Sequence, residues 1–319
     1  MRFSVIIPIY NKAPYVAKAI HSVLSQTCTD YELVIMDDGS SDRSFEVAEE
    51  TVKGIDNCRI YRQSNTGVSM ARNNAVGLSN GEYLCFLDAD DWWEPSFLES
   101  VSALISEYPD AGIYGTGYTI VNETKHKTRI AAIGVETGFD KGYINYCQVY
   151  ANGMYMPLCI GSVCIPRSVF NEMGGFKKQL KLGEDFDLWI RIALKYKVAF
   201  LNLPLFNYNQ DSSPEWRAVG RLHNPSSHML WNLDYLEDEE RKNPDYKQLI
   251  DNLRTFSLLP YYVSKRYRED ARKELQKVDW GAQPRKTRDL YKRPVLCLKL
   301  RQSLLSIGSF VKLWIYKHI

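Results

Sequence analysis

The alternation of two hydrophobic periodicities along the first half of the chain constrains its fold more than any other feature. Short apolar runs of the kind found in buried strands cover residues 3–10, 31–36, 58–63 and 82–87. Segments with helical spacing lie between them, at residues 13–26, 44–52 and 67–78. Strand–helix alternation with nearly continuous apolar strands predicts an α/β fold, in which helices cover both faces of a parallel sheet.

Beyond residue 95 the alternation becomes looser. The pattern predicts helices over residues 96–107, 167–173 and 184–196, and strands over 113–121 and 155–165. Residues 209–225 are rich in Ser, Pro and Asn, which is typical of a loop or lid. Residues 231–319 are expected to be mostly helical.

The small net charge of the 319 residues, +2, hides a division along the chain. Residues 241–319 carry 19 Lys and Arg against 7 Asp and Glu, a net charge of +12, so residues 1–240 carry −10. An acidic body with a basic tail indicates two regions with different partners. The apolar content of 45% and charged content of 24% exclude a disordered or collagen-like chain.

The cysteines and the apolar runs indicate the compartment. Seven scattered cysteines form no C-x-x-C pair, which argues against a zinc site and a disulfide framework. The apolar run near the N-terminus is too short for a signal-peptide core, and no stretch reaches the roughly 18 uncharged apolar residues of a spanning helix. We therefore expect a cytoplasmic protein in reducing conditions.

One acidic cluster follows the fourth predicted strand. Asp88, Asp90 and Asp91 repel one another, and a hard divalent cation such as Mg²⁺ or Mn²⁺ would remove that cost. The alternative is a solvated acidic turn, which the two tryptophans directly after the cluster make less fitting than a walled cleft. Ligands of parallel sheets bind at the carboxyl ends of the strands, which is where this cluster falls.

Three further motifs have both a structural and a functional interpretation. Asp37 and Asp38 suit a turn with a helix cap, or a carboxylate that accepts the N–H of a nucleobase. Arg72, one turn into a predicted helix, suits phosphate binding about as well as a structural role. Glu184 and Asp185 open a helix, where the helix dipole favours acids, but a carboxylate there can also act as a general base.

Taken in order, the motifs resemble those of the family 2 glycosyltransferases of GT-A fold. The segments that carry the resemblance are SVIIPIYN (residues 4–11), VIMDDGSSD (34–42), NTG (65–67) with ARN (71–73), GEYLCFLDADD (81–91) and GED (183–185). Each motif alone is weak, but five in this order are specific. The resemblance covers about the first 210 residues.

The resemblance implies roles for individual residues. Asp185 would be the catalytic base and Asp90 the direct ligand of a Mn²⁺ or Mg²⁺ cofactor. The nucleotide sugar would be bound by Pro8 and Tyr10 at the base, Asp38 on the base N3–H, Arg72 near the nucleotide and Asp88 in the D-x-D pair. The remaining candidates are Asn11, Asp37, Asp91, Glu184, and His223 and His228 on a flexible segment that could reach the diphosphate.

The same resemblance implies the architecture and the reaction. A GT-A domain would cover residues 1–210, with a nucleotide-sugar-binding half at 1–110 and an acceptor-binding half at 111–210, built on a doubly wound, mainly parallel sheet. A loop and a basic, mostly helical extension would follow at 211–319. The enzyme would transfer a sugar, UDP-linked, with inversion to a hydroxyl of a glycan or lipid-linked acceptor in bacterial surface polysaccharide synthesis.

The tail lies outside the resemblance. In residues 295–317 apolar side chains follow one helical stripe, made by Leu296, Leu300, Leu304, Ile307, Val311 and Trp314. Such a helix packs on the enzyme or on a second copy in a homodimer, or it lies on an anionic membrane surface. Further apolar side chains outside the stripe favour the membrane. Nucleic acid is a third possible partner for the basic charge of the tail, but no nucleic-acid-binding motif accompanies that charge.

Two other functions fit parts of the sequence. A nucleotidyltransferase shares the doubly wound sheet and the acidic metal ligands, but it usually carries a glycine-rich loop after its first strand, and residues 8–12 contain no glycine. A non-catalytic membrane-associated scaffold would keep the basic tail without the chemistry. The presence of all the acidic motifs argues against the scaffold.

Overall fold

The computed structural model divides into two units, Met1–Gly220 and Arg221–Ile319. A mixed β-sheet forms the centre of the first unit. The structure describes residues 2–153, 155–211 and 221–299. The strands are β1 Phe3–Ile9, β2 Tyr31–Asp37, β3 Cys58–Arg62, β4 Tyr83–Phe86, β5 Trp92–Trp93, β6 Ala111–Asn122, β7 Lys127–Ile130, β8 Lys141–Ile144, β9 Val163–Pro166 and β10 Lys197–Asn209. Their order is β3-β2-β1-β4-β9-β6-β10-β5, with β7 on β6 and β8 on β10.

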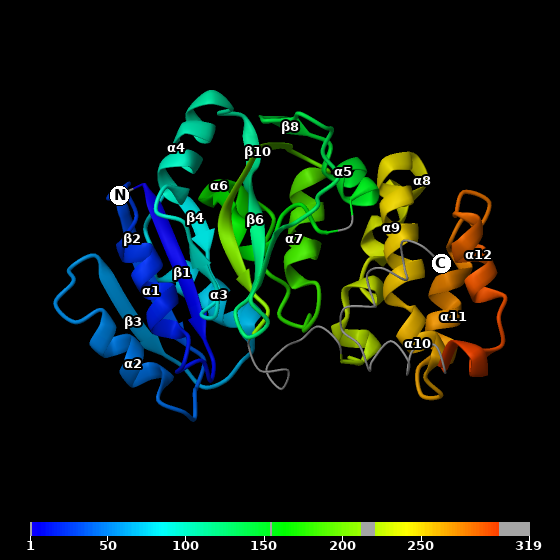
Figure 1. The fold of residues 1–319 in the computed structure, drawn as a ribbon, viewed down its shortest axis with the longest axis horizontal. Helices are drawn as coiled ribbons and strands as arrows, with labels where there is room; N and C mark the ends of the chain where they lie inside the picture. Colours follow the sequence, from blue (N-terminus) through cyan, green and yellow to red (C-terminus); the bar gives the residue numbers. More distant parts are fainter. Residues whose placement is uncertain (1, 154, 212–220, 300–319) are drawn as a thin grey trace. The chain divides into compact units, whose positions relative to one another are not determined.

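The first four strands pair in parallel, as the sequence predicts, and β6 and β10 form a second parallel pair (Figure 1). β1 lies between β2 and β4, so that Ile6 pairs with Val34 on one side and Phe86 on the other. Every residue of β1 and β2 is buried, which explains why both strands read as continuous apolar runs. Parallel pairing brings the carboxyl ends of β1, β2 and β4 to one edge of the sheet, where the acidic motifs begin.

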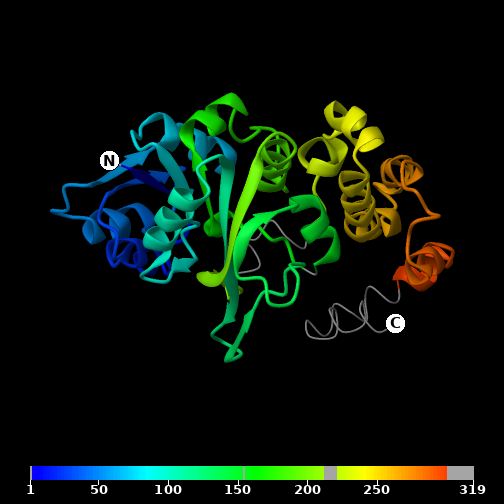
Figure 2. The same ribbon diagram turned by 90° about the horizontal axis from the view of Figure 1, so that it is seen from above.

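Helices cover both faces of this sheet, which also confirms the prediction. They are α1 Val16–Leu24, α2 Ser44–Thr51, α3 Val68–Gly77, α4 Phe97–Glu107, α5 Tyr146–Asn152, α6 Arg167–Glu172 and α7 Glu184–Ala193. Val5 and Ile7 join a core with α1, α2 and α4. Phe86 points to the opposite face, where its ring lies 5.9 Å from Phe170 of α6 and 5.2 Å from Phe176. Figure 2 shows the sheet between α4 and α7.

The second half of the sheet departs from the sequence-based expectation. The strand expected over residues 155–165 begins only at Val163, because residues 160–162 form a 3-10 turn in which Ser162 Oγ accepts the N–H of Cys159 at 3.0 Å. The sequence does not predict β10, because Pro204 and three asparagines interrupt its apolar pattern, and the strand accommodates them with irregular register around Leu201 and Pro204. β5, β7, β8 and α5 are also unpredicted, since each is too short to show a periodicity.

The described part of the second unit is helical, as predicted. Its α-helices are α8 Glu237–Lys242, α9 Pro244–Ser257, α10 Leu259–Val263, α11 Arg268–Gln276 and α12 Arg285–Tyr291. Arg254 of α9 is buried, and its guanidinium pairs with Glu240 of α8 at 2.9 Å and lies 3.5 Å from Glu274 of α11. Loss of the guanidinium or of its carboxylate partners would leave buried charge unpaired, which is costly. The network therefore holds the three helices together.

The structure also bears on the expectations for the tail. Among the described residues, no helix has the length and apolar character that crossing a bilayer requires. The described tail ends at Lys299, so most of the apolar stripe expected over residues 295–317 lies outside the described residues, as does most of the loop expected over residues 209–225.

Candidate active site

The end of β1 and the loop after it position three of the predicted site residues. Pro8 is buried within β1, whereas Tyr10 directly after the strand is 41% exposed. Asn11 adopts a left-handed backbone conformation (φ 53°), and its side-chain oxygen accepts the N–H groups of Ser41 at 2.9 Å and Asp42 at 3.4 Å. Asn11 therefore links the loop after β1 to the loop after β2 and holds Tyr10 at the sheet edge.

The two aspartates at the end of β2 are both buried and paired with protein groups. Asp37 lies 3.0 Å from Nε of Arg62 in an ion pair. Asp38 accepts the backbone N–H groups of Thr66 and Gly67, both at 2.8 Å, and so holds the loop that leads into α3. These bonds match the structural interpretation in part, because the two carboxylates stabilise loops but neither caps a helix. Base binding by Asp38 stays a prediction, and it would use the carboxylate's remaining acceptor capacity.

Arg72 of α3 joins two of the acidic motifs. Its side chain is 3% exposed; one guanidinium nitrogen lies 2.7 Å from Asp88, at the end of β4, and the other lies 2.9 Å from Glu184, at the start of α7. Burial alone would lower the pKa of the guanidinium, but the charges of Asp88 and Glu184 raise it above its ordinary value. Arg72 is therefore a permanent cation at the centre of the cluster.

The neighbour of Arg72 fixes the geometry of this contact. The Asn73 side chain donates to the carbonyl of Phe176 at 2.8 Å and accepts the N–H of Phe176 at 3.0 Å. Gly175 permits this close approach, because it has φ of +65° and a Cβ there would lie 2.8 Å from the Asn73 oxygen. The loop before α7 is thus attached to α3, which holds Glu184 against Arg72.

Asp185, the predicted base, lies in the first turn of α7 beside this ion-pair network. Burial and the adjacent Glu184 raise the pKa of Asp185 to about 7, while the N–H of Phe186, donated at 2.8 Å, and the positive charge of Arg72 oppose the rise. The negative charge of Asp88 also contributes to the raised pKa of Asp185, so the carboxylates of Asp88 and Asp185 influence each other electrostatically. Asp185 can therefore exchange a proton near neutral pH.

Asp90, the predicted metal ligand, forms an ion pair that the sequence analysis missed. Its carboxylate lies 2.5 Å from Nζ of Lys12, and both side chains are largely buried, 14% and 15% exposed. Lys12 immediately follows Asn11 in the loop after β1. The position of Lys12 next to the first motif was the only hint in the sequence that it belongs to the site. Its pairing with Asp90 could not be predicted, because 78 residues separate the two and no periodicity links them.

The rest of the acidic segment contacts other parts of the first unit, and a site role for Asp91 stays a prediction. Asp91 is buried and accepts the N–H of Asn209 at 2.8 Å, which attaches the segment to the end of β10. Burial first, and then the charges of Asp90 and Asp88, raise its pKa. Trp93 is buried in the core, stacked on Phe97 with centroids 4.2 Å apart, so only Trp92 of the two tryptophans is partly exposed.

The carboxylates after β4 form a small set of possible ligands for a divalent cation. Among the described residues, no three His, Cys, Asp or Glu side chains gather in an arrangement that could hold a metal on their own. Mg²⁺ and Mn²⁺ commonly bind through one or two carboxylates and complete their shell with water and substrate phosphates. Asp90 with Asp88 fits that smaller donor set, provided that Lys12 releases Asp90.

The two predicted histidines belong to the second unit. His228 is buried there, and its Nδ1 accepts the N–H of Leu230 at 3.1 Å. Its ring contacts Trp231 and Tyr261, and burial lowers its pKa to about 4. The backbone N–H of His223 donates to the hydroxyl of Tyr261 at 2.9 Å. The contacts of His228 are those of a core residue, and a role for either histidine at a diphosphate stays a prediction.

Comparison with known sequences extends the motif resemblance. Residues 4–161 match the family described as glycosyl transferase family 2. An uncharacterised glycosyltransferase of Rickettsia felis is 29% identical over 246 residues, which are 74% of this chain and 39% of the relative. Glycosyltransferase GlyA of Streptococcus pneumoniae is 30% identical over 217 residues, 65% of this chain and 30% of the relative. The chain thus spans about a third of the length of these curated relatives.

Comparison with solved structures identifies a similar fold. The crystal structure of residues 1–349 of S. aureus TarS in complex with UDP-GlcNAc matches with a TM-score of 0.68 and 19% identity, covering 86% of this chain and 78% of TarS 1–349. At this identity the likeness concerns the fold, and it confirms the expected α/β architecture of GT-A type with a helical C-terminal region.

Proposed function

The chain belongs to glycosyltransferase family 2 through its first unit, and on this premise we propose that it transfers a sugar from a nucleoside-diphosphate sugar to a hydroxyl group with inversion. The observation that carries the proposal is the bridge formed by Arg72 between Asp88 and Glu184. It gathers the D-x-D segment and the candidate base, Asp185, around one cation, although the two motifs lie far apart in the sequence.

Asp185 is suited to the role of general base. A base works best when its pKa lies near the operating pH, and burial beside Glu184 raises the pKa of Asp185 to about 7. As the acceptor oxygen bonds to the anomeric carbon, the bond from that carbon to the diphosphate breaks on the opposite face, and Asp185 takes the hydroxyl proton. A single displacement of this kind inverts the configuration, as in inverting glycosidases.

The leaving diphosphate needs positive charge where Asp88 and Asp90 lie. Asp90, with Asp88 beside it, would hold Mn²⁺ or Mg²⁺, which when bound acts as a Lewis acid on the departing phosphate. Lys12, now paired with Asp90 at 2.5 Å, and Arg72 are the protein's own cations at this edge. Both can contribute hydrogen bonds and charge to the phosphate oxygens.

We infer the donor and acceptor classes from chemistry. A uridine donor is supported by the UDP-GlcNAc complex of TarS, and Pro8, Tyr10 and Asp38 are the residues proposed to receive the base. The acceptor would be a hydroxyl of a glycan or lipid-linked glycan in bacterial surface polysaccharide synthesis. The net charge of +12 in residues 241–319 supports a cytoplasmic enzyme that associates peripherally with an anionic membrane.

The direct test is a screen of the purified chain against a panel of nucleotide sugars with Mn²⁺ or Mg²⁺, with detection of released nucleoside diphosphate. We expect metal-dependent turnover of one donor class, and near-complete loss of transfer in Asp185→Asn with donor binding retained. Asp110→Asn is the matched control, because Asp110 is an exposed carboxylate paired with Lys197. Its activity should equal that of the wild type.

Other outcomes of the screen point to the rival functions. Release of pyrophosphate instead of nucleoside diphosphate would identify a nucleotidyltransferase. The absence of turnover across the whole panel, with the protein folded and its metal site loaded, would favour a non-catalytic scaffold. Wild-type transfer by Asp185→Asn would leave the family assignment intact and remove Asp185 as the base.

A further inference from the structure

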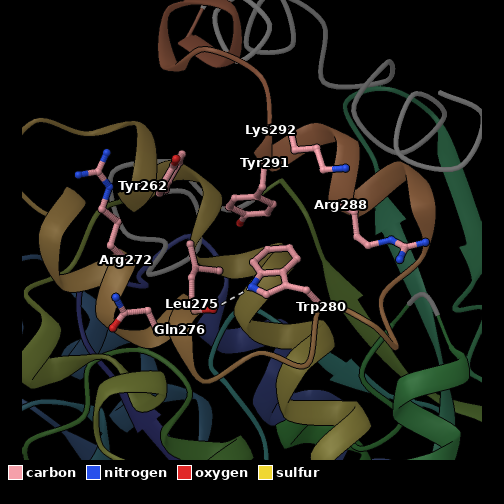
Figure 3. A pocket seen from close by; sticks show the side chains of 8 residues that line it. All are labelled: Tyr262, Arg272, Leu275, Gln276, Trp280, Arg288, Tyr291 and Lys292. Carbon is pink, nitrogen blue, oxygen red and sulfur yellow. Dashed lines mark hydrogen bonds between the residues drawn. The ribbon is translucent and has the colours of Figure 1, made fainter.

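A cavity of about 420 Å³ lies among α10, α11 and α12 of the second unit (Figure 3). Its size is within the range of small-molecule sites. We propose that this cavity binds the phosphate headgroup of an anionic lipid, with the phosphate on its cations and the first methylenes of the lipid on its aromatic rings. The proposal goes beyond sugar transfer and does not depend on it.

Three aromatic rings line the cavity in a row. The ring of Tyr291 meets Tyr262 at a centroid distance of 5.4 Å and Trp280 at 5.2 Å, both edge to face. The Tyr291 hydroxyl donates to the carbonyl of Thr255 at 2.7 Å, and the Trp280 indole N–H donates to the carbonyl of Leu275 at 3.2 Å. Because these polar atoms already have protein partners, the rings offer the cavity mainly apolar surface.

Three cations also line the cavity, and no Asp or Glu does among the described residues that form it. Arg272 lies on one side of the rings, and Arg288 and Lys292 lie on the other (Figure 3). Arg272 and Lys292 have exposed acidic neighbours, Glu269 at 2.9 Å and Asp289 at 3.7 Å. Arg288 is partly buried and has no carboxylate partner in the described part of the chain. The cavity therefore suits an anion.

The arrangement of the rings distinguishes between anionic ligands. Interplanar angles of 63° and 64° leave no pair of parallel ring faces between which a nucleobase could be sandwiched, whereas a flexible methylene chain fits between tilted rings. Residues 262–299 carry 12 Lys and Arg against 5 Asp and Glu, and Leu296, just beyond α12, is 69% exposed. Aromatic rings, cations and an exposed leucine together are typical of an interface with anionic lipid.

The first test measures sedimentation of the full chain with phosphatidylcholine vesicles that contain or lack phosphatidylglycerol. Arg288→Glu should reduce binding to the anionic vesicles about tenfold, since each Lys or Arg near the surface contributes measurably. Arg285→Glu is the matched control, because Arg285 lies in the same helix, is 88% exposed and does not line the cavity. Its loss should be clearly smaller than that of Arg288→Glu, because Arg285 contributes only the diffuse attraction of a charge near the surface. Equal losses in the two variants would overturn the proposal in favour of diffuse attraction.

The second test separates a lipid from free phosphate. Trp280 reports on the cavity, so its fluorescence, isolated by difference from Trp280→Phe, should change saturably with short-chain phosphatidylglycerol below its micellar concentration. Inorganic phosphate and glycerol phosphate should give no response at the same concentrations. An equal response to glycerol phosphate, or none to the short-chain lipid, would contradict the proposal. Neither assay uses sugar transfer, so failure here removes the lipid site and leaves the proposed sugar transfer standing.

Discussion

The protonation of Asp185 should set the pH dependence of sugar transfer, and Glu184 should control where that dependence falls. Asp185 must be deprotonated to accept the hydroxyl proton, so activity should rise with pH through its pKa of about 7. Glu184→Gln keeps the shape of the side chain and a hydrogen-bond acceptor for Arg72, but removes the like charge beside Asp185. The activity rise should then move to lower pH.

The expected magnitudes follow from the neighbouring charges. With a pKa of about 7, about 10% of Asp185 is deprotonated at pH 6 and about half at pH 7, so the rate should increase about fivefold between them. Two carboxylates ~6 Å apart at an effective dielectric of ~20 repel by ~3 kcal/mol, or ~2 pKa units. Because Arg72 already offsets part of this repulsion, Glu184→Gln should lower the Asp185 pKa by about one unit.

The assay is kcat/KM for nucleoside diphosphate release from pH 5.5 to 8.5, which reports ionisations of the free enzyme. At pH 6 the variant should reach about half of its own plateau, against about a tenth for the wild type. Glu172→Gln is the control, because Glu172 is exposed and pairs with Lys195, so its profile should match the wild type. A flat wild-type profile would refute the assignment of Asp185 as the base, and an unshifted profile in Glu184→Gln would refute the control of its pKa by Glu184.

Two further predictions concern the cations of the site. Arg72→Ala should destabilise the first unit to urea by about 2–3 kcal/mol, somewhat less than a fully buried pair because Asp88 is 33% exposed, and Arg72→Lys should recover only part of the loss. A stability for Arg72→Ala equal to wild type would contradict the bridge. Lys12→Ala should bind Mn²⁺ about fivefold to tenfold more tightly without donor, measured by electron paramagnetic resonance, because Asp90 loses its ammonium partner. Lys18→Ala, which removes an ammonium paired with Glu123, is its control, and an unchanged affinity in Lys12→Ala would show that Lys12 does not compete with the metal.

The sequence predicts the first half of the sheet well and the second half poorly, for a physical reason. β1 and β2 are buried on both faces, so nearly all of their positions are apolar and the strands stand out in the sequence. β10 contains Pro204 and polar positions that its irregular pairing with β6 tolerates, so its local pattern resembles a loop. Four-residue strands such as β7, which is exposed along its whole length, carry too few apolar positions to be recognised.

The candidate site shows the same limit at the level of side chains. Motif order identified Arg72, Asp88, Glu184 and Asp185 individually, and the structure gathers them. The sequence could not show that Arg72 pairs with Asp88 and Glu184 at once, because that contact depends on how the loop before α7 attaches to α3. Nor could it show Lys12 on Asp90, since a lysine in a loop is ordinarily solvated.

In its described residues, the structure also shows where the positive charge of the C-terminal part of the chain exceeds its internal acidic partners. In the second unit, Glu240, Asp251 and Glu274 are paired internally with Lys247, Arg254 and Lys277. Residues 285–299, by contrast, contain six Lys and Arg and only one acid, Asp289. Charges act over a Debye length of about 8 Å at physiological salt, so distant parts of the tail add little to attraction at any one point. Phosphate affinity at the cavity should therefore depend on Arg272, Arg288 and Lys292 more than on the total of +12.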